Sequence, residues 1–295
     1  MSQRETEYLT TKELAELLRI KERKVYDLVA SGRIPCSRAM GKLLFPRREI
    51  DSWLASGSSG GAAASAVPRP NVILGSHEPL LEWALRESGC GLATLMDGSL
   101  DGLKRFANGE GLATGLHLYE PGNGEWNVAV VQSRFAHAPV ALVEFAWRER
   151  GLIVVPGKET EFGDIRALKA QRVVPRQPAA GSQVLLQQLF EQAGLGPDDV
   201  EWAATARTEA DAALAVLEDK ADAAFGLRAM ARQLQLAFVP LVRERFDVLV
   251  DRAAWFDPPL QQFWNFCRSP AFFAKAAELA GYDVSGCGTV HFNGG

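Results

Sequence analysis

Apolar residues recur at helical spacing in three short stretches near the N-terminus. Leu14, Leu17 and Leu18 stand at positions i, i+3 and i+4, which places them on one face of a helix. The same spacing recurs at Val25, Leu28 and Val29, and again at Ile50, Trp53 and Leu54. The pattern predicts three amphipathic helices within residues 1–54. The first two are separated by about three residues, a spacing typical of a helix-turn-helix.

The ends of these predicted helices carry local signals. Thr10 and Glu13 match a capping box, so the first helix is expected to begin at Thr11. Pro46 is expected at the first position of the third helix, where a missing N–H costs nothing. Between the second and third helices, a hairpin with its turn at Met40-Gly41-Lys42 would form a wing. We therefore expect an all-α winged helix-turn-helix over residues 1–54.

Strands and helices alternate over residues 71–295. The runs Val72–Leu74, Gly91–Leu95 and Arg172–Val174 each lead through a loop with Gly and Ser into a helical pattern, beginning at Leu80, Leu100 and Val184. This alternation predicts an α/β fold with a largely parallel sheet, which binds ligands at the carboxyl ends of its strands. Residues 55–70 are rich in Ala, Ser and Gly and are expected to form a flexible linker.

Charge separates the two parts of the chain. Residues 1–54 hold 11 Lys and Arg against 8 Asp and Glu, whereas the remainder holds 21 against 28. A basic head on an acidic protein is typical of DNA binding, because its cations engage phosphates. The expected contacts are Thr11, Lys21, Arg23, Lys24, Tyr26, Arg38, Lys42 and Arg47. Each cation is alternatively an ordinary solvated charge, and Tyr26 alternatively packs beneath the wing.

Three serines stand at or just before predicted helix starts in the body. These are Ser76, Ser99 and Ser182. A helix start exposes unpaired N–H groups and the positive end of a dipole, so several starts that converge on one cleft would bind an anion. The alternative is routine helix capping, for which serine is a favoured residue.

Motifs for catalysis and for metal binding are missing from the sequence. It contains no G-x-S-x-G elbow between a strand and a helix, no P-loop and no G-x-G-x-x-G that opens a helix. The acidic residues Glu209, Asp211, Glu218 and Asp219 are spread as on solvated helix faces. We expect no enzyme activity and no metal site, since Cys36, Cys90, Cys267, Cys287, His77, His117, His137 and His291 show no ligand spacing. With no secretory signal and no long apolar run, a cytoplasmic protein is expected.

The head resembles the winged helix-turn-helix of the MerR and excisionase group. The matching residues are Tyr8–Leu18, Lys24–Tyr26, Gly32–Pro35 and Arg47–Leu54, in the order that the group has them. Lys21 departs from the Ser or Thr that usually caps the recognition helix. The resemblance implies a double-stranded DNA operator, and a homodimer is expected because such regulators usually read paired half-sites.

The body resembles a cytoplasmic group of the periplasmic binding proteins, found joined to DNA-binding heads or to molybdenum-cofactor biosynthesis domains. The matching stretches are Gly75–Leu81, Gly98–Leu103, Gly115–Leu118, Gly151–Gly157, Arg176–Pro178, Gly181–Ser182, Lys220–Gly226, Arg245–Val250, Arg268–Pro270 and Gly281–Asp283. The resemblance implies two α/β lobes of the type II arrangement, about 71–155 with 246–295 and about 156–245, joined by a hinge that the chain crosses twice.

The same resemblance implies that a small ligand binds between the lobes, with molybdate or tungstate as effector and no cofactor. The residues implied are Ser76, His77, Ser99, His117, Arg176, Ser182, Gln183 and Arg228. Gln183 stands where relatives typically have an arginine, which leaves a less charged ligand open. We therefore predict a ligand-responsive transcriptional regulator. The alternatives are a regulator of another small polar metabolite and an excisionase-like factor whose body binds nothing.

Overall fold

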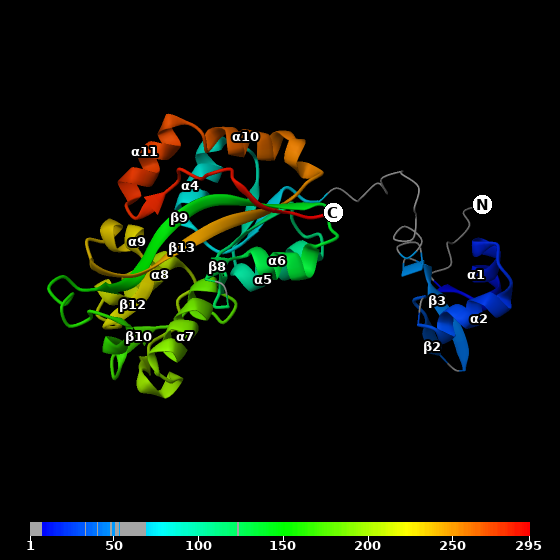
Figure 1. Cartoon of the computed structure of the whole chain (residues 1–295), viewed down its shortest axis with the longest axis horizontal. Helices are drawn as coiled ribbons and strands as arrows, with labels where there is room; N and C mark the ends of the chain where they lie inside the picture. The colour runs from blue at the N-terminus through cyan, green and yellow to red at the C-terminus, as the bar shows by residue number, and fades with distance from the viewer. Residues whose placement is uncertain are drawn as a thin grey trace. The chain divides into compact units, whose positions relative to one another are not determined.

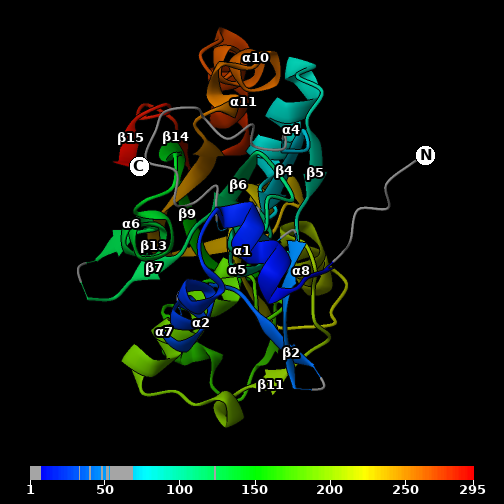
Figure 2. The same ribbon diagram turned by 90° about the vertical axis from the view of Figure 1, so that its right-hand side faces the viewer.

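The computed structural model describes residues 8–32, 34–39, 41–47, 49–50, 53, 69–122 and 124–295. The chain divides into two compact units, residues 1–68 and 69–295, which are drawn in Figures 1 and 2. Most of the predicted linker lies outside the described residues. Its last residues belong to the body, because Arg69 forms an ion pair with Asp251 at 2.6 Å and donates to the carbonyl of Gly111 at 3.0 Å.

The head combines helices with a small antiparallel sheet, so the expectation of an all-α head is wrong. Its elements are β1 (Tyr8–Leu9), α1 (Thr11–Leu18), α2 (Glu22–Ala30), β2 (Ser37–Ala39) and β3 (Lys42–Pro46), with strand order β1-β3-β2. Leu9 pairs with Phe45, and both side chains are buried. Pro46 pairs with Tyr8 at the end of β3 rather than starting a helix; the helical residues described beyond it are 47, 49, 50 and 53.

The predicted start of the first helix is confirmed. The Thr10 hydroxyl accepts from the N–H of Glu13 at 3.3 Å, and the Glu13 carboxylate accepts from the N–H of Thr10 at 2.8 Å. Lys21 is the N-cap of α2 and makes no side-chain capping bond. The apolar stripes meet in a core that includes Leu14, Val25 and Ile50, each fully buried. Local capping and helical periodicity therefore determine this part of the head.

The body is built on one mixed sheet with the strand order β11-β10-β12-β9-β13-β6-β4-β5. The strands are β4 (Val72–Gly75), β5 (Ala93–Leu95), β6 (Ala113–Leu116), β9 (Val140–Val154), β10 (Arg172–Val174), β11 (Glu201–Trp202), β12 (Ala223–Leu227) and β13 (Ala237–Asp251). The groups β6-β4-β5 and β10-β11-β12 are parallel, as expected. Between them β9 and β13, 15 residues each, run antiparallel, so the prediction of a largely parallel sheet fails at the centre.

The two long strands join two lobes (Figure 1). The helices are α4 (Pro79–Ser88), α5 (Ser99–Ala107), α6 (Val128–Phe135), α7 (Gly181–Ala193), α8 (Glu209–Leu217), α9 (Arg228–Gln233), α10 (Pro258–Phe266) and α11 (Pro270–Leu279). Short strands β7 (Tyr119–Glu120) and β8 (Glu125–Trp126) pair together, and β14 (Tyr282–Asp283) and β15 (Val290–Asn293) pair with β9. Phe263 and Phe272, from α10 and α11, pack with Leu81 and Phe145 of the first lobe, so the C-terminal segment returns to it.

Helix starts in the body differ slightly from the sequence expectation. Glu78 is the N-cap of α4, so Ser76 lies two residues before the cap. Ser99 is the first residue of α5, with Gly98 as its N-cap. Helix α7 begins at Gly181 rather than Val184, which places Ser182 within its first turn. The earlier start follows from Ala180, whose carbonyl accepts from the N–H of Val184 at 3.1 Å.

Candidate functional site

Two of the predicted serines meet in the first lobe. Ser76 follows β4 and Ser99 begins α5, and both are buried. Their hydroxyl oxygens are 2.7 Å apart, and the Ser99 hydroxyl accepts from the backbone N–H of His117 at 3.2 Å. The loops that follow β4, β5 and β6 therefore converge on one point, at the carboxyl ends of parallel strands.

The second lobe touches this point through the start of α7. The N–H of Leu100 donates to the carbonyl of Ala179 at 3.2 Å. Gly98 and Gly181 allow the approach, since a Cβ on Gly98 would lie 2.5 Å from the oxygen of Ala179, and one on Gly181 2.8 Å from that of His117. Ser182 follows Gly181 and is buried. We call this contact, formed by Ser76, Ser99, His117 and Gly181, the serine junction, and Ser182 is the next residue of α7 after it.

Arg176 and Gln183 support the loop that precedes α7. The side-chain oxygen of Gln183 accepts from the N–H of Arg176 at 2.8 Å. The Arg176 guanidinium donates to the carbonyl of Ala206 at 3.1 Å and forms an ion pair with Glu209 at 2.9 Å. Arg176 is buried and its charge is compensated within the protein. It therefore brings no free positive charge to the serine junction.

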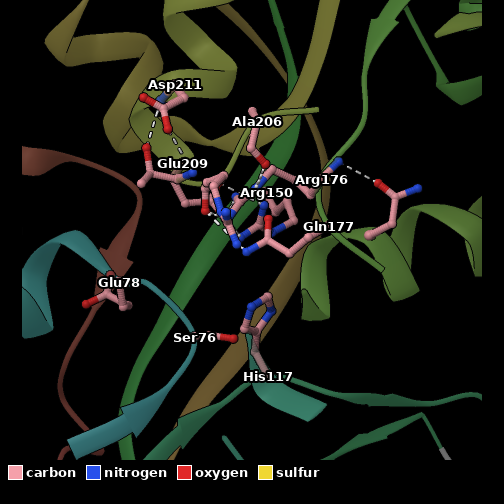
Figure 3. Close-up of polar contacts among 12 residues, drawn as sticks. Ser76, Glu78, His117, Arg150, Arg176, Gln177, Ala206, Glu209 and Asp211 are labelled. Atoms are coloured by element: carbon pink, nitrogen blue, oxygen red, sulfur yellow. Dashed lines mark hydrogen bonds and ion pairs between the residues drawn. The ribbon is translucent and has the colours of Figure 1, made fainter. Parts of the chain in front are cut away.

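A buried network of charges lies at the junction of the lobes (Figure 3). It consists of Glu78, Arg148, Arg150, Arg176, Glu209 and Glu244, all less than a tenth exposed. Arg150 donates to Glu209 at 3.0 and 3.2 Å and to Glu244 at 2.9 Å. Arg148 lies 2.6 Å from Glu244 and 3.6 Å from Glu78, and the Tyr282 hydroxyl donates to Glu78. We call these six residues the charge network; their formal charges cancel.

Mutual compensation keeps Glu209 and Glu244 ionised despite their burial. Burial by itself raises the pKa of Glu209, but Arg150 and Arg176 outweigh it and lower that pKa to about 2. The same balance, with Arg148 and Arg150 as the cations, holds the pKa of Glu244 well below its ordinary value. The expectation that Glu209 lies on a solvated helix face is wrong, because this side chain reaches inward from the start of α8 to Arg150.

His117 connects the serine junction to the charge network. Its Nδ1 lies 2.9 Å from a carboxylate oxygen of Glu244. Burial lowers the pKa of His117 to about 4, although Glu244 opposes the shift. The ring is therefore neutral at neutral pH, and Nδ1 carries the proton because an ionised carboxylate can only accept.

Besides Arg176 and Gln183, the predicted ligand residues His77 and Arg228 lie outside the serine junction. The Nε2 atom of His77 lies 3.2 Å from a carboxylate oxygen of Glu82, which is in the first turn of α4. Arg228 forms an ion pair with Glu149 at 2.5 Å and lies over the ring of Phe238. Glu149 stands between Arg148 and Arg150 on β9, and successive strand residues point to opposite faces. Arg228 therefore lies on the face of β9 opposite the charge network.

Sequence reasoning missed Glu78, Arg148, Arg150 and Glu244. One signal was present: Arg148 and Arg150 are two residues apart, a spacing that puts two side chains on the same face of a strand. Their partner Glu244 comes from β13, 94 residues beyond Arg150. Such a pairing depends on the antiparallel register of β9 and β13, which no local pattern specifies.

The predicted DNA contacts of the head are largely exposed. Lys21, Arg23 and Lys24 lie at the start of α2 with exposed side chains, and Tyr26 is 53% exposed. Thr11 is partly exposed at the start of α1, and Lys42 and Arg47 are exposed. The side chain of Arg38 lies outside the described residues. Val25 is fully buried between Lys24 and Tyr26, so α2 presents its polar face to solvent.

The described residues contain neither a metal-binding cluster nor a helix that could span a membrane. No group of three or more His, Cys, Asp and Glu there could hold a metal ion. No helix in the described part of the chain is long and apolar enough to cross a membrane.

Comparisons with known proteins agree with this two-part structure. Residues 8–58 match the family described as a helix-turn-helix domain. The uncharacterized protein YvgK of Bacillus subtilis is 26% identical over 97% of this chain and 98% of its own length. A candidate phosphate ABC transporter substrate-binding protein from Clostridium perfringens, solved with bound phosphate, is 12% identical and has a TM-score of 0.51 over 70% of this chain and 96% of its own.

A mutant OxyR of Corynebacterium glutamicum with bound H2O2 is also similar, at 12% identity and a TM-score of 0.49 over 92% of this chain and 90% of its own. At such identities the likeness to the Clostridium perfringens protein shows the fold alone. The family match is more extensive, because residues 82–268, well over half of the chain, match the PBP superfamily domain. The chain therefore belongs to the PBP superfamily and carries a helix-turn-helix DNA-binding domain at its N-terminus.

Proposed function

We propose that this protein is a one-component transcriptional regulator. The head, with its likeness to the MerR and excisionase group, binds an operator through the polar face of α2 and the β2–β3 hairpin. The body binds a small ligand between its lobes, and lobe closure changes how the two heads of a homodimer are spaced. The serine junction carries this proposal, because it joins loops of both lobes at the point where α5 and α7 begin.

A small oxyanion, molybdate or tungstate, is the first ligand class that we propose. Two helix starts and the hydroxyls of Ser76, Ser99 and Ser182 supply neutral donors, which suit an anion without any lysine. Such donors favour a fully deprotonated ion, because a ligand that brings its own proton needs an acceptor. Phosphate carries such a proton at neutral pH and is expected to bind more weakly.

A different polar metabolite is the second candidate. The observation that favours it is charge balance: Arg176 is compensated by Glu209, and Arg150 by Glu209 and Glu244. The hydroxyls of Ser76 and Ser99 also satisfy each other at 2.7 Å. A ligand at the serine junction must replace that contact, and a neutral ligand would leave the charge network undisturbed.

Calorimetry with the full chain tests the ligand class. Molybdate and tungstate are expected to bind, and Ser99→Ala is expected to weaken the binding by roughly 1.5–3 kcal/mol if the hydroxyl donates to a charged ligand. Ser133→Ala is the matched control, because Ser133 is exposed on α6 and its hydroxyl donates only to the carbonyl of Val130 among the described residues.

Three outcomes of the calorimetry distinguish the candidate functions. Metal oxyanions that bind less tightly to Ser99→Ala than to Ser133→Ala would support the oxyanion site. No heat with either oxyanion, together with binding of an uncharged metabolite, would move the ligand to the second candidate. If no ligand binds at all, the body is ligandless and the head acts as an excisionase-like DNA-binding factor.

A further inference from the structure

A cavity of about 680 Å³ lies between the lobes on the side of α4, α9 and α11. The first lobe lines it with α4 and α11, and the second lobe lines it with α9 and the first turn of α8. In Figure 1, α11 lies above α9 at the left of the body, and α9 packs against α11. Cavities of roughly 300–1,000 Å³ are typical of small-molecule sites.

The charges around this cavity are not balanced. Lys275 forms an ion pair with Glu278 at 2.9 Å, whereas Glu82 lies 3.2 Å from His77, whose ring is charged only when it is protonated. Arg86 on α4 and Arg232 on α9 also line the cavity, and neither forms an ion pair with any described residue. Each lobe thus supplies one guanidinium without an ion-pair partner, and Arg86, Arg232 and Lys275 outnumber the carboxylates of Glu82 and Glu278. Guanidinium groups bind carboxylate and phosphate through paired hydrogen bonds.

The remaining wall is apolar. It includes Trp83, Met230 and Leu279. The Trp83 ring is fixed by Phe266, with ring centroids 5.5 Å apart, and by Lys275, whose ammonium lies 5.9 Å from the Trp83 ring centroid. His77 adds a polar atom, because its Nδ1 is buried without a hydrogen-bond partner among the described residues. A bare tetrahedral ion would contact only a small part of this wall.

We propose that this cavity binds an organic dianion, with one anionic group held by Arg86, the other by Arg232, and an apolar body against Trp83 and Met230. The site is separate from the serine junction and takes a different class of ligand. Because each lobe supplies one arginine, the dianion binds best when the lobes are closed, and it shifts the population toward that arrangement. Its effect on DNA binding rests on the proposed regulatory function.

Isophthalate is a suitable probe, since it places two carboxylates on a rigid aromatic ring. Its binding to the full chain would be measured by calorimetry and by thermal melting, with benzoate as the single-carboxylate control. We expect isophthalate to bind and benzoate to bind at least about tenfold more weakly. Arg86→Ala and Arg232→Ala are each expected to weaken isophthalate by about tenfold or more.

Arg134→Ala is the matched control, because Arg134 is exposed on α6, outside the cavity. All three arginines are exposed, so folding should be preserved, and the melting temperature without ligand checks this. The proposal is overturned if isophthalate does not bind at about 10 mM, or if Arg86→Ala and Arg232→Ala bind it as tightly as Arg134→Ala does. Binding at the cavity without any change in DNA affinity would instead count against the proposed function alone.

Discussion

At the scale of single residues, buried charge at the lobe junction persists because each group has an opposite partner. Arg150 contacts both Glu209 and Glu244, and Arg148 contacts Glu244. Taking ions out of water costs several kcal/mol each, and only good geometry offsets that cost. His117 avoids the cost of a buried charge in a different way. Burial lowers its pKa to about 4, so the ring is neutral at neutral pH.

His117 makes stability depend on pH in a defined window. Its pKa rises from about 4 in the folded chain to the ordinary 6.5 on unfolding, so the unfolded chain binds the extra proton between these values. The stabilisation is complete above pH 6.5 and is lost as the pH falls toward 4. We expect the free energy of unfolding of the body to drop by roughly 2 kcal/mol between pH 7 and pH 5 through this group.

Denaturant unfolding of the wild type, His117→Gln and His137→Gln at both pH values measures the effect. His137 is exposed, so its variant should keep the full pH dependence of the wild type. His117→Gln should lose most of it. If His117→Gln and His137→Gln show the same drop, His117 is not held neutral by burial.

Residue roles were predictable only where the cause is local. The capping pair of Thr10 and Glu13 follows from their spacing, and the structure has it. The local sequence does not indicate that Glu209 is buried, because an acidic residue that follows an N-cap threonine such as Thr208 is typical of any first helical turn. Its burial depends on Arg150, 59 positions earlier in the chain. Long-range pairing of this kind cannot be derived from one sequence.

At the scale of elements, the lobes meet where glycine allows backbones to approach. Gly98 has φ +115°, and a Cβ there would lie 2.5 Å from the oxygen of Ala179. Gly109 has φ +78°, and a Cβ added there would meet nothing within 4 Å. Both glycines have a positive φ, which disfavours side chains, but of the two only Gly98 faces the other lobe.

Gly98→Ala is therefore expected to open the lobe contact as well as to strain the backbone. Gly109→Ala should cost about 1–2 kcal/mol through conformation alone, and Gly98→Ala should cost more. The two variants would be compared by denaturant unfolding, and by small-angle scattering for the separation of the lobes. Equal stability and equal scattering of the two variants would show that the contact between Gly98 and Ala179 contributes nothing to closure.

Strand-to-helix units were predictable because each is short and carries its own signals. The runs that begin at Val72 and Arg172 became β4 and β10, each followed by its helix. The sequence pattern did not indicate that β9 and β13 extend over 15 residues each. Both strands are buried along much of their length, so they lack the alternation that marks a strand with one solvated face.

At the scale of the whole molecule, a DNA-binding head and a PBP superfamily body occur in one chain. The two candidate ligand sites both lie between the lobes of the body, and both would be altered by bending of the paired strands β9 and β13, which join the lobes. A ligand changes DNA affinity only if it binds the two arrangements of the lobes unequally. The regulatory account therefore requires a measurable coupling between ligand and DNA.

The most direct test is a fluorescence anisotropy titration of labelled duplex DNA, selected by the full chain from a random pool. It would be run with and without a saturating ligand identified by calorimetry, at several salt concentrations. Arg23→Ala combined with Lys24→Ala serves as the head variant, since both side chains are exposed on α2.

For a ligand-responsive regulator, we expect saturating ligand to change the DNA affinity of the full chain by about fivefold or more. We also expect that affinity falls steeply with salt, and that the head variant binds weakly whether or not ligand is present. The central claim would be contradicted if saturating ligand left the affinity unchanged, or if the head variant bound the duplex as tightly as the wild type.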